Sequence, residues 1–290
     1  MDTPKPMRPE LAHTRGSIPK LTAADPVADK LKRHLKTFWN NQQCYWDSVS
    51  SEEFVESPVR QRMASFLLAG ESVLDIACGT AANSEWIKER CRYFGVDLSI
   101  KALQRPIHPS LMLACGDADG LPFRKECFDA VIATYVLEHA VEPVVTLQEM
   151  CRVVKPHGKI ILLGPAWDFP FWYPNSLRSK KAERGWRLRY TLGRLWGQLM
   201  GCSFGKLPFA RVDEPDAFRS EFVYDADAVY IVWTYEVIRL MKTWGHNLAH
   251  WEVDDPLLGA NPVIRKFKSV LRCFPIYRYA GSTILLVFEK

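Results

Sequence analysis

The sequence predicts an α/β fold built on a doubly wound, mostly parallel β-sheet. Three observations lead to this prediction: short apolar runs recur along the chain, segments with helical spacing lie between several of them, and the first two runs carry an acid near their end. Undiluted apolar runs of about four to eight residues indicate strands that are covered on both faces. Strands that alternate with helices indicate parallel pairing through right-handed crossovers.

Seven apolar runs mark the expected strands, and they are residues 72–77, 91–99, 110–118, 128–136, 158–165, 246–253 and 282–290. Apolar residues at helical spacing predict helices over residues 26–41, 57–69, 81–90, 99–105, 143–155 and 225–245. The alternation stops after Pro165 and resumes near residue 225, so we expect an insertion after the fifth strand.

This pattern divides the chain into five expected parts. A flexible arm rich in Pro, Lys, Thr and Ala comes first, and N-terminal helices follow it. A cofactor-binding core, a helical and aromatic cap inserted after strand five, and the C-terminal end of the fold complete the chain. In that order, the expected parts are residues 1–26, 27–70, 71–165, 166–225 and 226–290.

The composition argues against several classes of protein. The net charge of +5 is mild and lacks the concentrated basic stripe typical of nucleic-acid binding, so no nucleic-acid partner is expected. The eight cysteines include no pair at CxxC spacing, so we expect reduced thiols in a cytoplasmic protein and no metal site. No apolar run approaches the roughly 20 residues that a membrane-spanning helix needs.

The stretch LDIACGTAANSEW, residues 74–86, has the order of a nucleotide-binding turn: an apolar strand, an acid, a tight turn and a helix. A dinucleotide site uses the pattern GxGxxG to cradle a pyrophosphate. Residues 77–82, ACGTAA, keep only Gly79 of those glycines, which makes a nicotinamide cofactor the weaker alternative. S-adenosylmethionine carries no phosphate and tolerates a wider turn.

Two acidic residues suit S-adenosylmethionine. Asp75 stands before the turn, where its charge can organise the loop and the ammonium end of the cofactor. Asp97 ends the second strand 22 residues later, where its carboxylate can accept both ribose hydroxyls. Because open parallel sheets bind ligands beyond the carboxyl ends of their strands, we expect both acids at one site.

Four blocks, VLDIACGTA, GVDLS, GDADGLPFRKECFDAVIATYVLEH and RVVKPHGKIILLG, follow one another between residues 71 and 164. Together they resemble the core of class I S-adenosylmethionine-dependent methyltransferases, in the broad group that includes the ubiquinone/menaquinone-type enzymes. The resemblance implies a Rossmann-like sheet of seven strands with an antiparallel last strand, and S-adenosyl-L-methionine as the cofactor. It covers about a third of the chain.

The resemblance also implies roles for the matching residues. Asp97 would bind the ribose hydroxyls, Leu98 would lie against the adenine, and Asp117 would accept from the adenine amino group. An aromatic N-terminal element that includes Tyr45 would close over the cofactor. The full set of expected cofactor-binding residues is Tyr45, Asp75, Ala77, Gly79, Asp97, Leu98, Asp117, Ala118, Thr134 and Tyr135.

Two alanines, Ala77 and Ala81, replace glycines of the family pattern D/E-x-G-x-G-x-G. A methyl group on the Cα atom penalises positive φ. We therefore expect negative φ at both positions, with the Cβ atoms pointing away from the ligand, in a working site with a slightly tighter loop. The alternative is a decayed site that is kept as a structural corner.

The acceptor side offers fewer signals. His139 follows the fourth strand, and it is either the base that helps a hydroxyl acceptor or a loop histidine with a structural hydrogen bond. The insertion opens with an aromatic cluster, which forms either the wall of a site for a flat or lipidic acceptor or a small satellite core. The expected substrate-binding residues are Trp167, Phe171, Trp172 and Tyr173.

Residues 178–196 interleave seven basic residues with Trp and Leu, and only Glu183 opposes their charge. The spacing predicts an amphipathic basic helix. Such a helix either makes peripheral contact with an anionic membrane or forms the solvated outer face of the cap.

These observations predict an S-adenosylmethionine-dependent methyltransferase that acts by SN2 displacement on a small or lipid-like acceptor, with a hydroxyl oxygen as the expected nucleophile. The donor is already activated, so alignment and the exclusion of water carry the chemistry. Two alternatives stay open. One is a nicotinamide-dependent oxidoreductase, and the other is a non-catalytic binding module at a membrane surface.

Overall fold

The computed structural model describes residues 26–41, 46–47, 50–51, 57–165, 167–168, 188, 192, 196, 210–211, 228–254, 262–279, 281 and 283–290. The predicted N-terminal arm, residues 1–26, lies outside this part of the chain except for its last residue.

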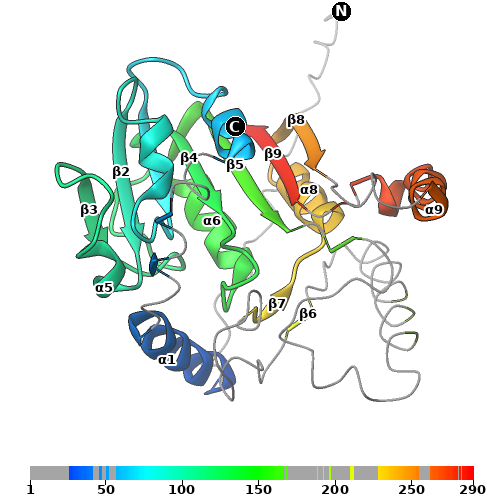
Figure 1. Ribbon diagram of the computed structural model, residues 1–290, viewed down its shortest axis with the longest axis horizontal. Helices are drawn as coiled ribbons and strands as arrows, with labels where there is room; N and C mark the ends of the chain where they lie inside the picture. The colour runs from blue at the N-terminus through cyan, green and yellow to red at the C-terminus, as the bar shows by residue number, and fades with distance from the viewer. Residues whose placement is uncertain are drawn as a thin grey trace, which may run out of the picture.

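Seven strands form the central sheet (Figure 1). In spatial order they are β3 (Met112–Cys115), β2 (Arg92–Asp97), β1 (Ser72–Ile76), β4 (Phe128–Thr134), β5 (Val154–Pro165), β9 (Thr283–Glu289) and β8 (Asn247–Asp254). Strands β1 to β5 pair in parallel, and β9 is antiparallel to both of its neighbours. The predicted fold class is therefore confirmed, and the chain's last strand lies between its fifth and its sixth long strands.

Helices lie between and around these strands. The described α-helices are α1 (Pro26–Asn41), α4 (Pro58–Ala64), α5 (Ile100–Leu103), α6 (Pro143–Val153), α8 (Thr234–Thr243) and α9 (Pro262–Arg272). Two short 3-10 helices, η1 (Ala82–Trp86) and η6 (Pro275–Tyr277), and a pair of two-residue strands, β6 (Ala210–Arg211) and β7 (Tyr230–Ile231), complete the described elements.

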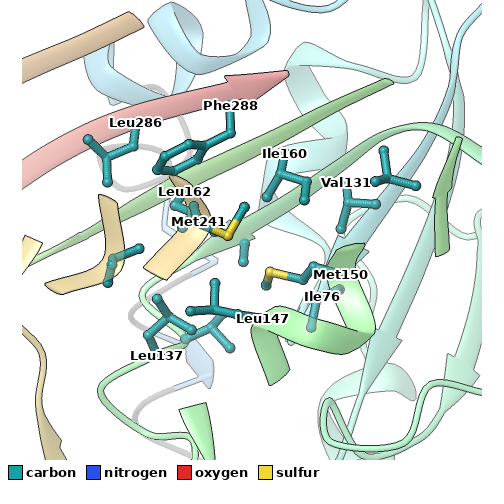
Figure 2. Close-up of a cluster of buried hydrophobic side chains, with 14 of the residues drawn as sticks. Ile76, Val131, Leu137, Leu147, Met150, Ile160, Leu162, Met241, Leu286 and Phe288 are labelled. Atoms are coloured by element: carbon teal, nitrogen blue, oxygen red, sulfur yellow. The ribbon is translucent and has the colours of Figure 1, made fainter. Parts of the chain in front are cut away.

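Both faces of the sheet carry a hydrophobic core. Successive side chains of a strand point to opposite faces, so in β4 Val131 and Ala133 belong to one cluster while Ala130 and Ile132 belong to the other. The first cluster packs the sheet against α6 and α8, and Figure 2 shows members such as Met150 and Met241 meeting there. The second packs α4 against the opposite face.

The segment after β1 is less helical than the sequence predicts. Residues 81–90 were expected to form a helix, but only the short η1 is present. Ala81 precedes it in the left-handed region with φ 61°, and it has no side chain that could cap a helix. The side chain of Asn83 donates instead to the carboxylate of Asp75, at 3.0 Å. The hydrogen bond from Asn83 to Asp75 thus holds the turn in place, and no regular helix follows it directly.

The helix expected over 225–245 is also shorter. It begins at Thr234 because the buried carboxylate of Asp168 accepts the backbone N–H groups of Thr234 and Tyr235, at 3.1 and 3.3 Å. It is followed by Gly245 with φ 87°, a conformation that favours glycine after a helix. Asp168 thereby ties the start of the insertion to the C-terminal part of the fold.

Most of the predicted insertion, residues 166–225, lies outside the described residues. Its described strand β6 pairs antiparallel with β7, just before α8. Trp167 is buried, with 2% of its surface exposed. Within the described residues, no helix combines the length and the apolar character needed to cross a bilayer.

Candidate active site

A cavity of about 410 Å³ lies at the carboxyl ends of β1, β2 and β4. The order of the sheet reverses at this place, because the chain runs from β1 outward to β3 and then returns to β4 on the other side of β1. Ligands bind at such switch points in open α/β sheets. Helix α1 supplies the facing wall through Lys32, Leu35 and Trp39.

This cavity brings together nine residues that the sequence singled out, and they are Ala77, Gly79, Asp97, Leu98, Asp117, Ala118, Thr134, Tyr135 and His139. Asp75 is fully buried behind the turn and is not part of the lining. Trp167 does not line the cavity either. Tyr45 and the aromatic residues Phe171, Trp172 and Tyr173 lie outside the described residues.

Asp97 links the end of β2 to the turn after β1. Its Oδ2 accepts the N–H of Gly79 at 2.8 Å, and its Oδ1 accepts the N–H of Ser99 at 2.7 Å. Burial raises the pKa of this carboxyl to about 6, although both hydrogen bonds favour the ionised form and lower it. Asp97 therefore offers a nearly buried carboxylate to the cavity, and its charge state changes just below neutral pH.

Asp75 acts on the cavity through other side chains. Its Oδ2 accepts from the hydroxyl of Tyr93 at 2.6 Å and from the amide of Asn83 at 3.0 Å, and its Oδ1 has no hydrogen-bond partner among the described residues. Burial raises the pKa of Asp75 to about 6, against the lowering effect of those two bonds. Asn83 also donates to the hydroxyl of Thr134 at 3.0 Å and accepts from the guanidinium of Arg60.

The turn between these acids has a strained backbone. Ala77, Gly79 and Ala81 have φ values of 53°, 57° and 61°. The backbone is therefore left-handed at each of the three positions that are glycine in the family pattern. The expectation of negative φ at the two alanines is therefore wrong. The turn has the geometry that glycine favours, and two alanines adopt it at a cost in free energy. The Ala77 methyl group is exposed at the cavity, whereas Ala81 is fully buried.

Gly79 is fitted to an aromatic side chain from the N-terminal part of the chain. A Cβ atom built on Gly79 would lie 3.0 Å from Cζ3 of Trp46, which is closer than ordinary contact. The indole of Trp46 donates to the carbonyl of Trp39 at 3.0 Å, and the two ring centroids are 5.6 Å apart. These two tryptophans therefore form the described part of an aromatic cover over the turn.

A cation fastens α1 to the rim of the cavity. The ammonium of Lys32 lies 3.0 Å from Asp119 and 3.1 Å from Glu142. Burial alone lowers the pKa of Lys32, but its hydrogen bonds to Asp119 and Glu142 and the charges of Asp119 and Asp117 raise it above the ordinary value. Asp117, on the same rim, accepts the N–H of Asp119 at 3.0 Å. Lys32 thus joins α1 to the two loops that follow β3 and β4.

The end of the cavity beside β4 carries the candidate base. Tyr135 has a φ of 56°, and its hydroxyl lies 3.3 Å from that of Thr283 in β9. We therefore expect the backbone of Tyr135, and not its hydroxyl, to contact a ligand in the cavity. His139 Nε2 lies 4.0 Å from the buried carboxylate of Glu138. The imidazole also meets the ring of Trp39 edge-on, with centroids 5.5 Å apart.

Several lining residues were not predicted from the sequence, and they include Lys32, Trp39, Trp46, Arg60 and Asn83. Four of them precede β1 in segments that the sequence marks only as amphipathic helix or aromatic-rich chain. Asn83 is the exception, because it stands within the quoted turn stretch. A polar residue so soon after Gly79 is a signal from which a site residue could have been predicted. Among the described residues, no group of His, Cys, Asp and Glu could hold a metal ion.

Comparison with known proteins gives a match over the same region. Residues 74–162 match the methyltransferase domain family. Demethylmenaquinone methyltransferase of Corynebacterium urealyticum is 36% identical over 104 residues, which cover 36% of this chain and 45% of that protein. The enzyme of the same name from Streptomyces griseus is 32% identical over 107 residues, or 36% of this chain and 46% of that protein. The chain thus matches less than half the length of these relatives.

Solved structures share the fold at low identity. A S-adenosylmethionine-dependent methyltransferase from Mesorhizobium loti has a TM-score of 0.51 at 14% identity, over 83% of this chain and 99% of that chain. A second one from Thermotoga maritima has a TM-score of 0.50 at 16% identity, over 89% and 99%. Residues 74–162 of this chain are thus similar to the methyltransferase domain family, and the chain shares its fold with these S-adenosylmethionine-dependent methyltransferases.

Proposed function

We propose that this protein transfers a methyl group from S-adenosylmethionine to a hydroxyl oxygen of a small, lipid-like acceptor. The observation that carries the proposal is the cavity at the switch point, where Asp97 and the left-handed turn at Gly79 meet at the ends of adjacent strands. Carboxylates suit the hydroxyl and amino groups of an adenosyl ligand, and the described lining of this cavity holds no pyrophosphate cradle with three glycines.

The residues of the cavity offer a partner to each part of the donor, namely the ribose, the adenine and the methionine part. Asp97 would hold the ribose hydroxyls with Leu98 against the adenine, and Asp117 with Ala118 would meet the adenine amino group. At the other end, Ala77 and Gly79 leave backbone surface free for the methionine part.

A buried cation completes the fit at the methionine end. Arg60 is 5% exposed, lines the cavity and donates to Asn83, which also bonds Asp75 and Thr134. A planar guanidinium matches a carboxylate, and a nearby carboxylate matches an ammonium group. Arg60 therefore offers a positive charge to the carboxylate of the donor, whereas Asp75 acts on this end of the cavity only through Asn83, which it holds in place.

The bound donor supplies a methyl group on a sulfonium, which needs no further activation. The chain's own task is then to align the acceptor, to exclude water and to receive a proton. His139 lines the cavity beside Tyr135 and Thr134, and its imidazole would take the proton of the acceptor hydroxyl at Nε2 or Nδ1. Trp39 holds the ring edge-on and limits its rotation.

The acceptor itself is proposed by class only. The relatives named above are demethylmenaquinone methyltransferases, and an aromatic, lipid-like acceptor suits the rings of Trp39 and Trp46 in the cavity wall. We propose that the insertion at 166–225, with Phe171, Trp172 and Tyr173, closes the acceptor side.

Calorimetry and a transfer assay test the proposal together. Titration with S-adenosylhomocysteine should give saturable heat at one site, and titration with NADH should give none. Incubation with donor labelled in its methyl group and with a lipid-soluble metabolite extract should then move label into an organic phase. Heat with NADH alone would favour an oxidoreductase, whereas nucleoside binding without transfer to any fraction would contradict methyl transfer and leave a binding module.

His139→Gln separates the proposed base from a structural histidine. The glutamine amide keeps hydrogen-bonding groups, but it does not take up a proton near neutral pH. We expect kcat to fall by about 100-fold or more while the affinity for S-adenosylhomocysteine stays the same. Equal loss of both would instead indicate that the imidazole only supports the loop.

A further inference from the structure

Helix α9 presents an apolar stripe to solvent. Val263, Phe267 and Val270 lie at positions i, i+4 and i+7, and Phe274 continues the same line just beyond the helix. Their exposed fractions are 75%, 54%, 55% and 56% in that order. Exposed apolar residues are common one by one, but three in line on one short helix, continued by a fourth just beyond it, are typical of an interaction surface.

Helix α9 departs from the usual pattern of a surface helix, because it exposes apolar side chains as well as basic ones. An amphipathic helix normally turns its apolar side to the core and its charges to water. In α9 the side chain of Lys268 is 1% exposed, while both phenylalanines of the stripe are more than half exposed. Figure 1 shows α9 standing out at the end of the molecule opposite β3, beyond α8. More than half of the surface of each stripe residue therefore faces solvent.

The charge around the stripe is of one sign. From residue 256 to residue 288 the sequence contains five basic residues and no Asp or Glu. Arg265, Lys266 and Arg278 are exposed, and Arg272 is half-buried. A one-signed basic segment with a line of exposed apolar side chains combines the two attractions that hold a helix in the interface of an anionic bilayer.

We propose that α9, with Phe274, docks this protein on the surface of an anionic phospholipid bilayer. Val263, Phe267, Val270 and Phe274 would enter the headgroup region, and Arg265 and Lys266 would meet lipid phosphates. This surface differs from residues 178–196, which the sequence offered for membrane contact. The proposal does not depend on methyl transfer, because no residue of the stripe lines the cavity.

Size and charge argue against a second copy of the chain as the occupant. A stable protein interface uses about 20–30 residues on each side, whereas the stripe and its exposed basic neighbours are fewer than ten. In a symmetric pair, moreover, each basic segment would face another of the same sign, and like charges oppose such contact. An anionic bilayer needs neither a large area nor a complementary fold.

Flotation of the full-length protein with vesicles tests the proposal. Wild-type protein should float with vesicles of phosphatidylcholine and phosphatidylglycerol, should float poorly with phosphatidylcholine alone, and should lose much of its binding at high salt. The variant F267S/F274S should lower the partition coefficient on anionic vesicles at least tenfold. The matched control L68S/M112S removes two equally exposed apolar side chains, Leu68 at 62% and Met112 at 52%, and should bind as wild type.

A second pair of variants tests the charge. R265Q/K266Q should weaken binding several-fold at low salt and little at high salt, and K125Q/K242Q should have a smaller effect. Near-UV circular dichroism and S-adenosylhomocysteine binding report whether each variant is folded. If F267S/F274S misfolds, the charge pair and the salt series decide the proposal.

Three results would overturn it. The first is wild-type protein that stays with the soluble fraction on anionic vesicles. The second is binding that survives both α9 variants but is lost when Arg184, Arg187 and Arg189 are neutralised, because the membrane surface would then be residues 178–196. The third is concentration-dependent self-association that F267S/F274S abolishes without any vesicle binding.

Discussion

The cavity has two sides that are built in different ways. On the sheet side, carboxylates and strained backbone meet within a few residues of the strand ends, as in the pairing of Asp97 with Gly79. On the N-terminal side, aromatic rings and a cation reach the cavity across long stretches of chain, as when Lys32 meets Asp119 and Trp39 meets His139. One side therefore follows from the topology of the sheet, and the other from the docking of α1 onto it.

This difference separates two tasks. The sheet side supplies the hydrogen-bonding groups that distinguish an adenosyl ligand, so its loss should remove binding. The N-terminal side supplies apolar cover and a cation, so its loss should weaken binding and admit water. Variants on the two sides should therefore differ in the size and the kind of their effects.

The largest effect is expected at Asp97. Asp97→Ala removes the carboxylate that would accept the ribose hydroxyls, and charged hydrogen bonds of this kind contribute about 1.5–3 kcal/mol each. We expect the Kd for S-adenosylhomocysteine to rise about 100-fold or more by calorimetry. Thermal unfolding serves as the control, because the variant also leaves the N–H groups of Gly79 and Ser99 without their acceptor. Unchanged affinity in a folded Asp97→Ala protein would contradict the cofactor assignment altogether.

A second test uses pH. Burial raises the pKa of Asp97 to about 6, so protonation removes its acceptor role just below neutrality. The Kd for S-adenosylhomocysteine should be flat above pH 7 and should rise by up to about tenfold per pH unit below 6. Asp97→Asn should flatten most of this dependence, and the rest belongs to Asp75, whose pKa is also raised to about 6. An equally steep profile in Asp97→Asn would assign the titration elsewhere.

The same pKa shifts predict the opposite trend for the ligand-free protein. A carboxyl whose pKa is raised by folding binds its proton more tightly in the folded state than in the unfolded state. Asp75 and Asp97 therefore contribute stability below about pH 4 that is lost as the pH rises through about 6. Donor binding and intrinsic stability thus respond to these two acids in opposite directions, which is typical of a site kept for function.

The sheet side was the predictable side. Apolar runs located the strands because strands buried on both faces leave a strong signal, and the two acids stood at strand ends where parallel topology brings them together. Eight of the ten expected cofactor-binding residues line the cavity, and they are Ala77, Gly79, Asp97, Leu98, Asp117, Ala118, Thr134 and Tyr135. Their roles in binding remain predictions.

The N-terminal side could not be predicted in the same way. The periodicity of residues 26–41 predicted a helix and its apolar face. It did not predict which part of the sheet the helix packs against, because the first strand begins more than 30 residues later in the sequence. Lys32 is one of several cations in that helix, and its partners Asp119 and Glu142 are distant in the sequence. The backbone of the turn also escaped prediction, because local preference argues for negative φ at alanine whereas the β1 turn imposes positive φ.

The next test concerns Gly79, where the sheet side of the cavity contacts Trp46 of the N-terminal side. Gly79→Ala places a Cβ atom 3.0 Å from Cζ3 of Trp46 at a φ of 57°, so either the ring or the turn must move. We expect a loss of about 1–2 kcal/mol in the free energy of unfolding from the left-handed backbone. A loss of roughly tenfold in S-adenosylhomocysteine affinity should accompany it, since about 1.4 kcal/mol corresponds to tenfold.

A double-mutant cycle identifies the cause. Trp46→Leu removes the ring atoms that the new methyl group meets, so Gly79→Ala should cost less affinity in that background than in the wild type. The cost in stability should persist, because it arises from φ and not from the ring. If the affinity loss is the same in both backgrounds, the two sides of the cavity do not communicate through this contact.

The smallest effect is expected where the sheet side itself departs from the usual glycines. Ala77→Gly relieves a left-handed alanine, which costs about 1–2 kcal/mol, but glycine adds about 0.5–1 kcal/mol of chain entropy on folding, so the net gain is about 0.5 kcal/mol. Ala81→Gly also loses a fully buried methyl group, worth about 0.8 kcal/mol, so its net effect should be near zero or slightly unfavourable. Chemical denaturation of both variants measures the difference, and donor affinity should be unchanged in each. A larger gain at Ala81 than at Ala77 would mean that packing around the buried methyl group is itself strained, and the left-handed turn alone would then not explain the pair.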